Sequence, residues 1–483
     1  MRASVAVAGT DLGLLELFDG VSKALADVIT YGRPSPMKAS FLLTLLGLIF
    51  LSVFAASLTP PPPGGKRTTL VWATDNNPVR AEQCALFNKL NPDLFVMIDP
   101  QNADSQKVIV QSIGGVGPDL FDGYSAENLE NFVRAGIPLD VTDEFKKMDI
   151  DIYDLIWPTL LPGCVYRDRI YGFPRNANTN AVWYNKDLFD KAGVPYPKRD
   201  WSWDDLIATA KKLTVRDEAG KAKQFGFYWD FGNTSDLIFQ SGGRQFSKDG
   251  TVCLIDSPEA IDAVQRSRDL LHKYKIAPSP MEEAALATQG GWGSGGITFL
   301  MGGRVAMAYG GRWWLNLMRS QKGLNLGCVP LPFTKKRLYQ GGGGITMINR
   351  YSPKREAALR FLKYMSEKPY NDLINAQADA ISPVKKYAYT KEFLFNPAYP
   401  QEDYNEVWRF VTEHSEAPEF SPFLKGTELA PLKNQMDLVK NDLKPVPEAM
   451  KQAAIDTNAR IKRSIEINPM YAKMYRELKG ETP

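Results

Sequence analysis

The sequence predicts an α/β protein built from two lobes. The chain has 483 residues, which exceeds what a single hydrophobic core usually serves, so at least two lobes are expected. Short continuous apolar runs alternate with segments of helical periodicity, and glycine and proline mark the turns between them. The composition, 44% hydrophobic and 23% charged residues, is that of an ordinary globular protein.

An uncharged segment near the N-terminus predicts a membrane-crossing element. Residues 39–58 carry no charge, and twenty residues at about 1.5 Å each span roughly 30 Å of hydrocarbon. Arg33 and Lys38 precede this segment, so the positive-inside rule places the residues before it in the cytoplasm and those after it outside. The small residues Ala55–Ser57 also suit a signal-peptidase site, so a cleaved signal and a permanent anchor both stay open.

Two further segments flank this element. Residues 1–38 are either an over-extended start or a cytoplasmic helix, because apolar residues from Leu14 to Val28 recur at helical spacing. Residues 59–67 are rich in proline and glycine and predict an extended linker. No cysteine precedes Cys84, which excludes a lipid anchor on a cysteine at the end of the apolar segment.

Beyond the linker, strand-like and helix-like segments alternate. Leu70–Ala73 is a continuous apolar run, as expected for a parallel strand covered on both faces, and Val79–Leu90 is predicted to be the following helix. Ser352 is expected to cap a later helix that starts with Pro353. Further strands are expected at Phe95–Ile98, Leu120–Phe121, Phe225–Tyr228, Val305–Ala308 and Ile345–Ile348.

The stretch from Arg175 to Leu206 carries the most local information. Ala181–Tyr184 is a short β-prone run, and Gly193 marks the turn that follows. Ser202 is placed to cap the next helix and to form a capping box with Asp205. The buried stripe of that helix would be Leu206, Ile207, Ala210 and Leu213. By spacing alone, this stretch is one βα unit.

Five motifs occur in a fixed order after residue 67. They are Gly117–Phe121; Ile170–Pro174; Tyr184–Phe189 with Ala192 and Gly193; Phe299–Met307 with Gly310–Trp313; and Gly341–Ile345 leading into Ser352 and Pro353. Together they resemble the family 1 extracellular solute-binding proteins, the sugar-capturing components of bacterial ABC importers, whose best-known members bind maltose. The resemblance implies a two-lobed fold of the type II periplasmic-binding-protein class.

The resemblance also implies three passages of the chain between the lobes. These are expected near Arg175–Asn178, near Gly341–Gly344 and between residues 413 and 422. The first lobe would then comprise residues 68–177 and 342–415, and the second lobe residues 178–341 and 416–483. Glycine reaches backbone angles closed to other residues, so the second passage suits a hinge or a close approach to ligand, with Gly342 as the candidate contact. A flexible surface loop is the alternative.

The aromatic candidates for the site follow from the chemistry of a sugar. A sugar has an apolar face and a polar edge, so its site needs aromatic planes beside polar partners. Trp313 lies where family members place a stacking ring, and Trp229 with Asp230 lies where the resemblance implies a second one. Trp292, in a glycine-rich segment, is a candidate for the mouth of the cleft, whereas Trp314 is expected to pack. Core packing is the alternative for every tryptophan.

The polar candidates come from both lobes. Asp75 and Asn76 match a position where relatives bind ligand hydroxyls, and Tyr124 follows a predicted strand of the same lobe. Asn178 is an amide where maltose-binding relatives carry a carboxylate, which argues against maltose itself. Arg312 would clamp an acidic sugar through a bidentate ion pair, unless it is a surface arginine.

Several other kinds of chemistry are disfavoured. With only His272 and His414, a histidine-based metal site or a Ser-His-Asp triad is not expected, and no metal or cofactor is predicted. The net charge of +3, without a basic run, argues against nucleic acid. The glycines of residues 291–296 fit a dinucleotide pattern but lack the preceding strand. The four cysteines lack metal-ligand spacing, and one or two disulfides or buried thiols both stay open.

The expected function is that of a non-enzymatic, extracytoplasmic receptor for carbohydrate. It would act as a monomer, close on its ligand and deliver it to ABC permease subunits that work with a cytoplasmic ATPase. Three alternatives stay open. The chain could be a membrane-tethered carbohydrate sensor or adhesion module, a glycoside-active enzyme with two carboxylates, or a ferric-ion receptor using Tyr387 and Tyr389.

Overall fold

The structure is a computed structural model that describes residues 44, 47–48, 65–99, 105–286, 295–424 and 429–480. The chain forms two compact units, Met1–Gly65 and Lys66–Pro483, and nearly all described residues belong to the second. The predicted N-terminal extension, almost all of the uncharged segment 39–58 and most of the linker lie outside the described residues. Within the described ranges, no helix is both long and apolar enough to cross a membrane.

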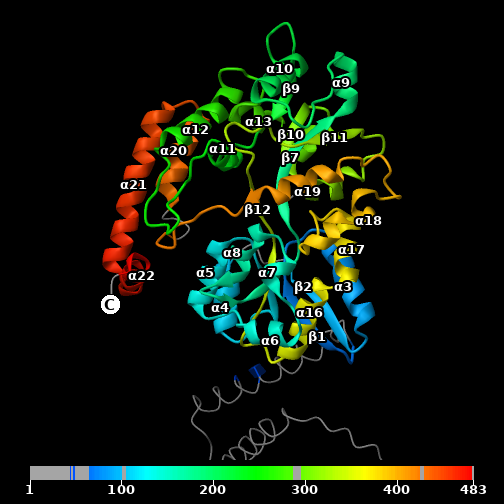
Figure 1. Ribbon diagram of the computed structural model, residues 1–483, viewed down its shortest axis with the longest axis vertical. Coiled ribbons are helices and arrows are strands. Elements are labelled where there is room, and N and C mark those ends of the chain that lie inside the picture. The colour runs from blue at the N-terminus through cyan, green and yellow to red at the C-terminus, as the bar shows by residue number, and fades with distance from the viewer. Residues whose placement is uncertain are drawn as a thin grey trace, which may run out of the picture. The chain divides into compact units, whose positions relative to one another are not determined.

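A five-stranded sheet forms the first lobe, in the lower half of Figure 1. Its strands run in the order β2 (Leu94–Asp99), β1 (Thr68–Ala73), β3 (Leu120–Gly123), β13 (Ile345–Ile348) and β6 (Gly172–Pro174). β1 is parallel to β2 and β3, whereas β13 is antiparallel to β3 and β6. Strands from two distant stretches of the sequence therefore build one lobe.

A second, seven-stranded sheet forms the other lobe (Figure 1). Its order is β14 (Ser415–Glu416), β12 (Tyr339–Gly342), β7 (Asn178–Asn185), β10 (Val305–Gly311), β9 (Ala222–Tyr228) and β8 (Val215–Arg216), and β11 (Leu326–Val329) also pairs with β7. β7 is the central strand, because its first residues pair with β12 and its later residues pair with β10 and β11. Two sheets in two lobes confirm the predicted architecture.

Helices surround both sheets (Figure 1). Around the first sheet and the hinge lie α3 (Val79–Leu90), α4 (Ser105–Ile113), α5 (Ala126–Ala135), α6 (Thr142–Lys147), α7 (Ile152–Leu155), η1 (Pro158–Leu160), α8 (Leu161–Cys164), a hairpin of β4 (Val165–Tyr166) and β5 (Arg169–Ile170), α16 (Arg355–Ser366), α17 (Lys368–Gln377), η4 (Lys385–Tyr389) and α18 (Lys391–Leu394). The second lobe contains α9 (Lys186–Ala192), α10 (Trp203–Leu213), η2 (Phe231–Asn233), α11 (Thr234–Gln240), α12 (Pro258–Leu271), α13 (Pro280–Leu286), α14 (Gly296–Met301), η3 (Arg312–Trp314), α15 (Leu315–Met318), α19 (Asn405–Glu413), α20 (Ala430–Lys440), α21 (Val446–Ile467) and α22 (Pro469–Lys479).

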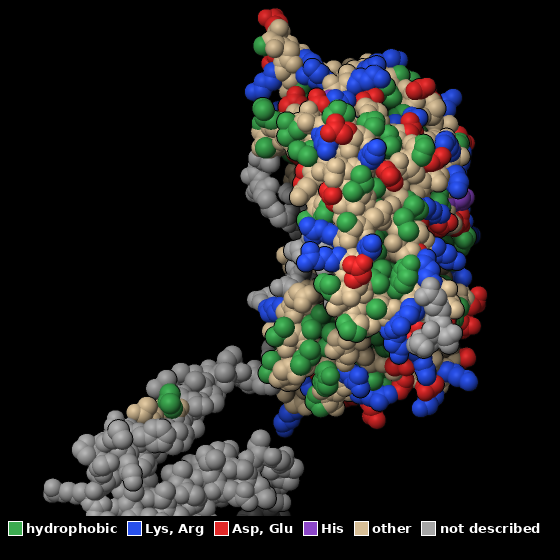
Figure 2. All heavy atoms as spheres, turned by 90° about the vertical axis from the view of Figure 1, so that its left-hand side faces the viewer, with side chains coloured by type: hydrophobic (Ala, Val, Ile, Leu, Met, Phe, Trp, Pro, Cys, Tyr) green, Lys and Arg blue, Asp and Glu red, His purple; other side chains and the backbone are tan. Residues whose placement is uncertain are grey.

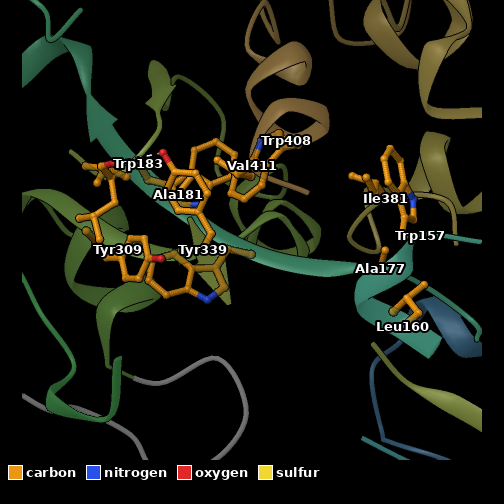
Figure 3. Packing of buried hydrophobic residues seen from close by; sticks show 14 of the residues in the cluster. Trp157, Leu160, Ala177, Ala181, Trp183, Tyr309, Tyr339, Ile381, Trp408 and Val411 are labelled. Carbon is orange, nitrogen blue, oxygen red and sulfur yellow. Dashed lines mark hydrogen bonds between the residues drawn. The ribbon is translucent and has the colours of Figure 1, made fainter. Parts of the chain in front are cut away.

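One continuous cluster of buried side chains runs through both lobes. Figure 3 shows part of it at either end of the stretch from Ala177 to Trp183. In the second lobe, the Trp183 ring lies 5.1 Å from the ring of Trp408 on α19. Toward the first lobe, Trp157 donates a hydrogen bond to the carbonyl oxygen of Ser382. The large apolar area buried here is the main source of stability for both lobes.

The local signals around residues 175–206 form as predicted. Ser202 accepts a hydrogen bond from the backbone of Asp205, whose carboxylate binds back to the Ser202 backbone, which completes the capping box of α10. Gly193 ends α9 in the left-handed conformation that glycine adopts without strain. All four predicted stripe residues of α10 are buried. These signals succeed because they depend only on neighbours in sequence.

One expectation is corrected by the structure, and one open alternative is decided. The later helix, α16, starts at Arg355 without a side-chain cap, since the Ser352 hydroxyl instead donates to Asp119 and accepts from the Lys354 backbone. The four cysteines, Cys84, Cys164, Cys253 and Cys328, are free and buried. Of the two alternatives that the sequence left open, buried thiols and not disulfides describe these cysteines. Burial raises the pKa of Cys84 to about 12, so that it stays a neutral thiol at ordinary pH.

Three chain segments connect the lobes. Arg175–Ala177 joins β6 to β7, and Gly343 with Gly344 joins β12 to β13, in the regions that the sequence indicates. The third connection differs in position. α19 already packs against β7 through Trp408, so the chain reaches the second lobe before α19, upstream of the expected passage at 413–422.

The glycines of the second connection allow its backbone to pack closely against the first connection. A Cβ at Gly343 would lie 2.1 Å from the carbonyl oxygen of Asn176, and a Cβ at Gly344 would lie 2.3 Å from Nε of Arg175. A Cβ at Gly342, in contrast, would meet nothing within 4 Å. The close approach that the glycine run predicts is therefore one between two connections of the hinge.

Candidate functional site

A cavity of about 370 Å³ lies where the two sheets meet the hinge. The first lobe contributes the turn after β3 and the first residues of α5, together with η1 and α8, while β12, the start of β7 and the segment after β14 line the other side. Its lining residues are Tyr124, Ser125, Ala126, Glu127, Thr159, Leu160, Gly163, Asn178, Thr179, Asn180, Gln340, Gly341, Gly342, Gly343, Ile345, Ala417, Pro418, Glu419 and Phe420. Both lobes thus contribute to one site.

Local capping fixes the turn that presents Tyr124. Ser125 caps α5 by accepting from the backbone of Asn128, and the Asn128 side chain accepts from the Tyr124 backbone at 2.9 Å. The turn follows the carboxyl end of β3, which is parallel to β1, and ligands usually bind beyond the carboxyl ends of parallel strands. The sequence between β3 and α5 therefore directs Tyr124 and Glu127 to the cavity.

Four residues that line this cavity each have a buried polar atom without a hydrogen-bond partner in the described part of the chain. These atoms are Thr159 Oγ1, Asn178 Oδ1, Gln340 Nε2 and Glu419 Oε2. An unpaired buried polar group costs about 1–3 kcal/mol, so a ligand that pairs with these atoms gains that energy. The set contains acceptors, one donor and one hydroxyl that does both, which complements a ligand rich in hydroxyl groups.

Two aromatic residues, one from each lobe, line the same cavity. Tyr124 comes from the first lobe and is 42% exposed, and Phe420 follows β14 in the second lobe and is half-buried. The guanidinium carbon of Arg175 lies 5.5 Å from the centre of the Tyr124 ring, a contact that holds the ring in place. Rings that line a polar cavity can stack on the apolar face of a flat ligand.

A network of buried charges supports the first-lobe wall. Arg175 pairs with Asp75 and, at 2.9 Å, with Asp122, while Arg80 pairs with Asp379 and, at 3.1 Å, with Asp75. Arg175 belongs to the first connection between the lobes and Asp379 to the segment after α17. The network therefore ties the hinge to the first sheet, and it holds Asp75 away from the cavity lining.

The pKa values within this network follow from burial and pairing. Burial alone would raise the pKa of Asp75, but the charges of Arg175 and Arg80 lower it to about 2. Burial dominates at Asp122 and raises its pKa, although this carboxyl group accepts hydrogen bonds from Trp72, Thr74 and Thr346. Asp75 is therefore charged at neutral pH and acts within the network.

The structure brings three of the predicted site residues to the cavity: Tyr124, Asn178 and Gly342. Asp75 lies in the charge network, and Asn76 beside it is exposed outside the cavity lining. The predicted residue Trp292 lies outside the described residues.

The second-lobe tryptophan predicted beside the sugar is a core residue. Trp229 is 2% exposed and stacks on Tyr309 with ring centres 5.3 Å apart. Asp230, the next residue, accepts from the Gly232 backbone and lines a neighbouring cavity. The alternative of core packing therefore describes Trp229.

The residues of η3 lie off the cavity lining. Arg312 is 2% exposed, binds the Asn405 side chain at 3.1 Å, and has a pKa that burial lowers to about 10. This buried position leaves it no access to the cavity, so it does not clamp an acidic ligand there. Trp313 is half-buried and meets the buried Trp314 edge to face, with ring centres 6.2 Å apart.

Sequence reasoning missed Glu127, Thr159, Gln340, Glu419 and Phe420. Gln340 immediately precedes the glycine run, and Glu419 and Phe420 fall within the segment 413–422 that was expected to cross between the lobes. Nearness to a predicted connection was therefore a usable signal. Thr159 lies in a one-turn helix. Tertiary packing brings this helix to the cavity, and no local sequence pattern indicates that position.

A second cavity of about 550 Å³ adjoins the first and shares Glu127, Glu419 and Phe420 with it. Its lining continues over η2, the segment after β14 and α20. No group of three or more His, Cys, Asp or Glu side chains able to hold a metal occurs among the described residues. The described site thus offers hydrogen bonds, rings and carboxylates as its means of recognition.

Two lobes that share a polar cavity flanked by rings define a solute receptor. The sequence profile of the family described as bacterial extracellular solute-binding protein matches residues 73–372, which is more than half of the chain. The chain belongs to this family, and it is an extracytoplasmic solute-binding protein.

Curated relatives support this assignment. The chain is 25% identical over 361 residues to a binding protein of Brucella abortus, a match that covers 72% of this chain and 82% of that protein. It is 26% identical over 349 residues to the arabinooligosaccharide-binding protein of Bacillus subtilis, covering 68% of this chain and 76% of the relative.

Solved structures share the fold. An ABC substrate-binding protein of Listeria monocytogenes in complex with cycloalternan is similar with a TM-score of 0.70 and 24% identity, covering 83% of this chain and all of that chain. The maltose/maltodextrin-binding domain of Bdellovibrio bacteriovorus bound to maltotriose gives a TM-score of 0.65 at 19% identity, covering 82% and 100%. These likenesses support the two-lobed fold.

Proposed function

We propose that this protein captures a carbohydrate between its lobes and delivers it to an ABC permease. The observation that carries the proposal is that four residues lining the interlobe cavity, Thr159, Asn178, Gln340 and Glu419, each have a buried polar atom without a partner. Sugar hydroxyls both donate and accept, so one sugar unit can pair with such a mixed set. The arabinooligosaccharide-binding relative and the maltotriose-bound structural neighbour support a ligand of this class.

Capture follows from the division of the site between the lobes. Tyr124 and Thr159 belong to the first lobe, and Gln340 and Phe420 lie in or beside the second sheet. A ligand that contacts both groups stabilises the closed arrangement in proportion to its preference for that state. A micromolar affinity corresponds to about 8 kcal/mol, which stacking and several hydrogen bonds supply after ordering costs.

The partners follow from this role. Closure of the lobes would be recognised by membrane permease subunits coupled to a cytoplasmic ATPase, and the residues before Lys66 would supply a signal or a membrane tether. A receptor releases its ligand without altering it, so we propose that the sugar leaves the cavity chemically unchanged. Recovery of intact sugar after prolonged incubation tests this part of the proposal.

The test of the main proposal is thermal unfolding in the presence of a sugar panel. Ligand at about 100 times its dissociation constant adds about 2.7 kcal/mol to the free energy of unfolding. The full chain in detergent should therefore show a clear rise in its midpoint with one class of mono- or oligosaccharide. A folded, ligand-free preparation that responds to no sugar would contradict the proposal.

A further inference from the structure

Two carboxylates stand where the two cavities join. Glu127, on the first turn of α5, and Glu419, just after β14, line both cavities, together with Phe420. They come from opposite lobes, and a ligand that extends from one cavity into the other passes the junction that they line. This position is distinct from the amide and hydroxyl lining formed by Thr159, Asn178 and Gln340.

The charges around the joined cavities are mainly negative. Among the described residues, Glu127 and Glu419 are the only charged side chains that line the first cavity. The second adds the carboxylates of Asp230 and Asp437 against the ammonium groups of Lys433 and Lys440. Four carboxylates thus face two cations. In contrast, acidic and basic side chains are interspersed over the outer face seen in Figure 2.

Neighbouring cations compensate the two junction carboxylates only in part. Glu419 is 18% exposed and pairs with Arg244 at 2.9 Å, but Arg244 also pairs with Glu416 at 3.1 Å. The second oxygen of Glu419 has no hydrogen-bond partner in the described structure. Lys433 is the cation that favours the charged form of Glu127, and burial nevertheless raises the pKa of both Glu127 and Glu419. Each carboxylate thus carries a desolvation cost that a cation from the ligand would offset.

We propose that the ligand is an amino sugar whose protonated amine binds the carboxylates Glu127 and Glu419 that line the junction of the two cavities. The inference rests on the proposed carbohydrate-binding function and adds the charge of the ligand to it. Hydrogen bonds between an ammonium group and a carboxylate are about twice as strong as neutral ones. The junction therefore selects an amine over a hydroxyl at the same position of the sugar.

The same geometry disfavours acidic sugars. A ligand carboxylate in the first cavity would face Glu127 and Glu419 without a lysine or arginine among the described lining residues. Arg312, the residue from which the sequence suggested an acidic ligand, is buried against Asn405. The order of affinity expected for one sugar skeleton is therefore amine first, neutral hydroxyl second and uronic acid last.

Matched sugar sets test this order. The full chain in detergent is titrated calorimetrically at about pH 6.5, below the pKa of about 7.7–8.0 for an α-amino group. The sets are glucose, glucosamine and glucuronic acid; the corresponding galactose series; and cello-oligosaccharides against chitosan oligosaccharides. In the set that binds best, the amine should bind at least about tenfold tighter than its neutral counterpart, and the uronic acid weakest.

Matched variants assign the preference to the two carboxylates. Glu127→Gln and Glu419→Gln should each lose most of the amine preference while still binding the neutral sugar. Glu416→Gln is the control, since Glu416 shares Arg244 with Glu419 but lines neither cavity. Because Glu127 has no ion pair at 4.0 Å or less among the described residues, its variant remains informative if loss of the Glu419 pair with Arg244 impairs folding.

Each outcome is decisive. Equal or tighter binding of the neutral sugar in every set, or a full amine preference in Glu127→Gln, overturns the inference and leaves the carbohydrate receptor standing. A folded protein that binds no member of any set overturns the proposed function and this inference together. A preference for the amine that the Glu127 and Glu419 variants lose and the Glu416 variant keeps supports it.

Discussion

At the scale of single residues, burial decides which candidates can touch a ligand. Trp229 and Arg312 have the side chains that a sugar site uses, yet each is 2% exposed and has its partners inside the protein. Tyr124, in contrast, is 42% exposed at the cavity. A suitable side chain is therefore necessary for a place in the site, but exposure to the cavity decides whether that side chain can contact the ligand.

Replacing Tyr124 with alanine should weaken carbohydrate binding by about tenfold, which is about 1.4 kcal/mol, because a stacking face is lost. Isothermal titration with the best-binding sugar measures this change. Tyr153→Ala is the matched control, since Tyr153 is 52% exposed on the first lobe outside the cavity lining. An unchanged affinity in Tyr124→Ala would remove this ring from the site.

Asp236 should make stability depend on pH. Burial raises its pKa to about 6 from 3.8, although it accepts hydrogen bonds from Tyr309 and from the backbone of Gln340. The folded state thus prefers the protonated form, so the contribution of Asp236 is fully favourable below about pH 4 and is lost as pH rises to about 6. The free energy of unfolding contributed by Asp236 therefore differs by about 3 kcal/mol between low pH and pH values well above 6.

The Asp236→Asn variant removes this titration. As pH rises from 4 to 7.5, the free energy of unfolding of this variant should increase by about 2–3 kcal/mol relative to that of the natural protein. Urea unfolding at both pH values measures this change. Asp75 should contribute a pH dependence of the free energy of unfolding with the opposite sign, which Asp75→Asn removes. The pKa of Asp75 is lowered to about 2, so its stabilisation is present above about pH 4 and is lost as pH falls toward 2. Parallel stability curves for Asp236→Asn and the natural protein would contradict the assignment.

At the scale of elements, the sequence predicted what depends on near neighbours. The bounds of α3 and β13 and the capping box at Ser202 follow from apolar runs and caps a few residues apart. The start of α16 was missed because Asp119, which is remote in sequence, accepts the Ser352 hydroxyl. The cavity residues were partly missed for the same reason, since Thr159 and Glu419 meet only after two separate segments have folded.

The hinge glycines should differ sharply in their tolerance of substitution. Gly343→Ala places a Cβ 2.1 Å from a backbone oxygen of Asn176, so two connections must separate, at a cost of about 2–3 kcal/mol. Gly342→Ala is the control for stability, because its Cβ meets nothing within 4 Å. Chemical unfolding measures the difference in the free energy of unfolding between the two variants. Equal values would mean that the two connections move apart at Gly343 without a cost in stability.

At the scale of the whole receptor unit, the lobes are joined by more than the hinge. α22 follows α21 of the second lobe, and its Lys479 pairs with Asp249 at 2.7 Å. The same helix reaches the first lobe, where the Arg134 guanidinium lies 4.8 Å from the centre of the Tyr471 ring (α22 and α5 in Figure 1). An exposed ion pair between Arg167 and Glu477, at 3.1 Å, adds little. α22 therefore limits how far the lobes separate.

Removing the aromatic contact should let the lobes open further. Tyr471→Ala deletes a buried cation–π interaction with Arg134 worth about 1–2 kcal/mol, together with an edge-to-face contact with Phe423. The ligand-free protein should therefore show a larger radius of gyration in small-angle scattering, while saturating sugar restores the natural value. Tyr475→Ala is the control, because Tyr475 lies on the same helix and also packs against Phe423, whereas the Arg134 guanidinium lies over the ring of Tyr471. Since opening competes with closure on the ligand, Tyr471→Ala should also weaken sugar binding several-fold. A radius of gyration equal to that of the natural protein would show that the hinge alone sets the opening.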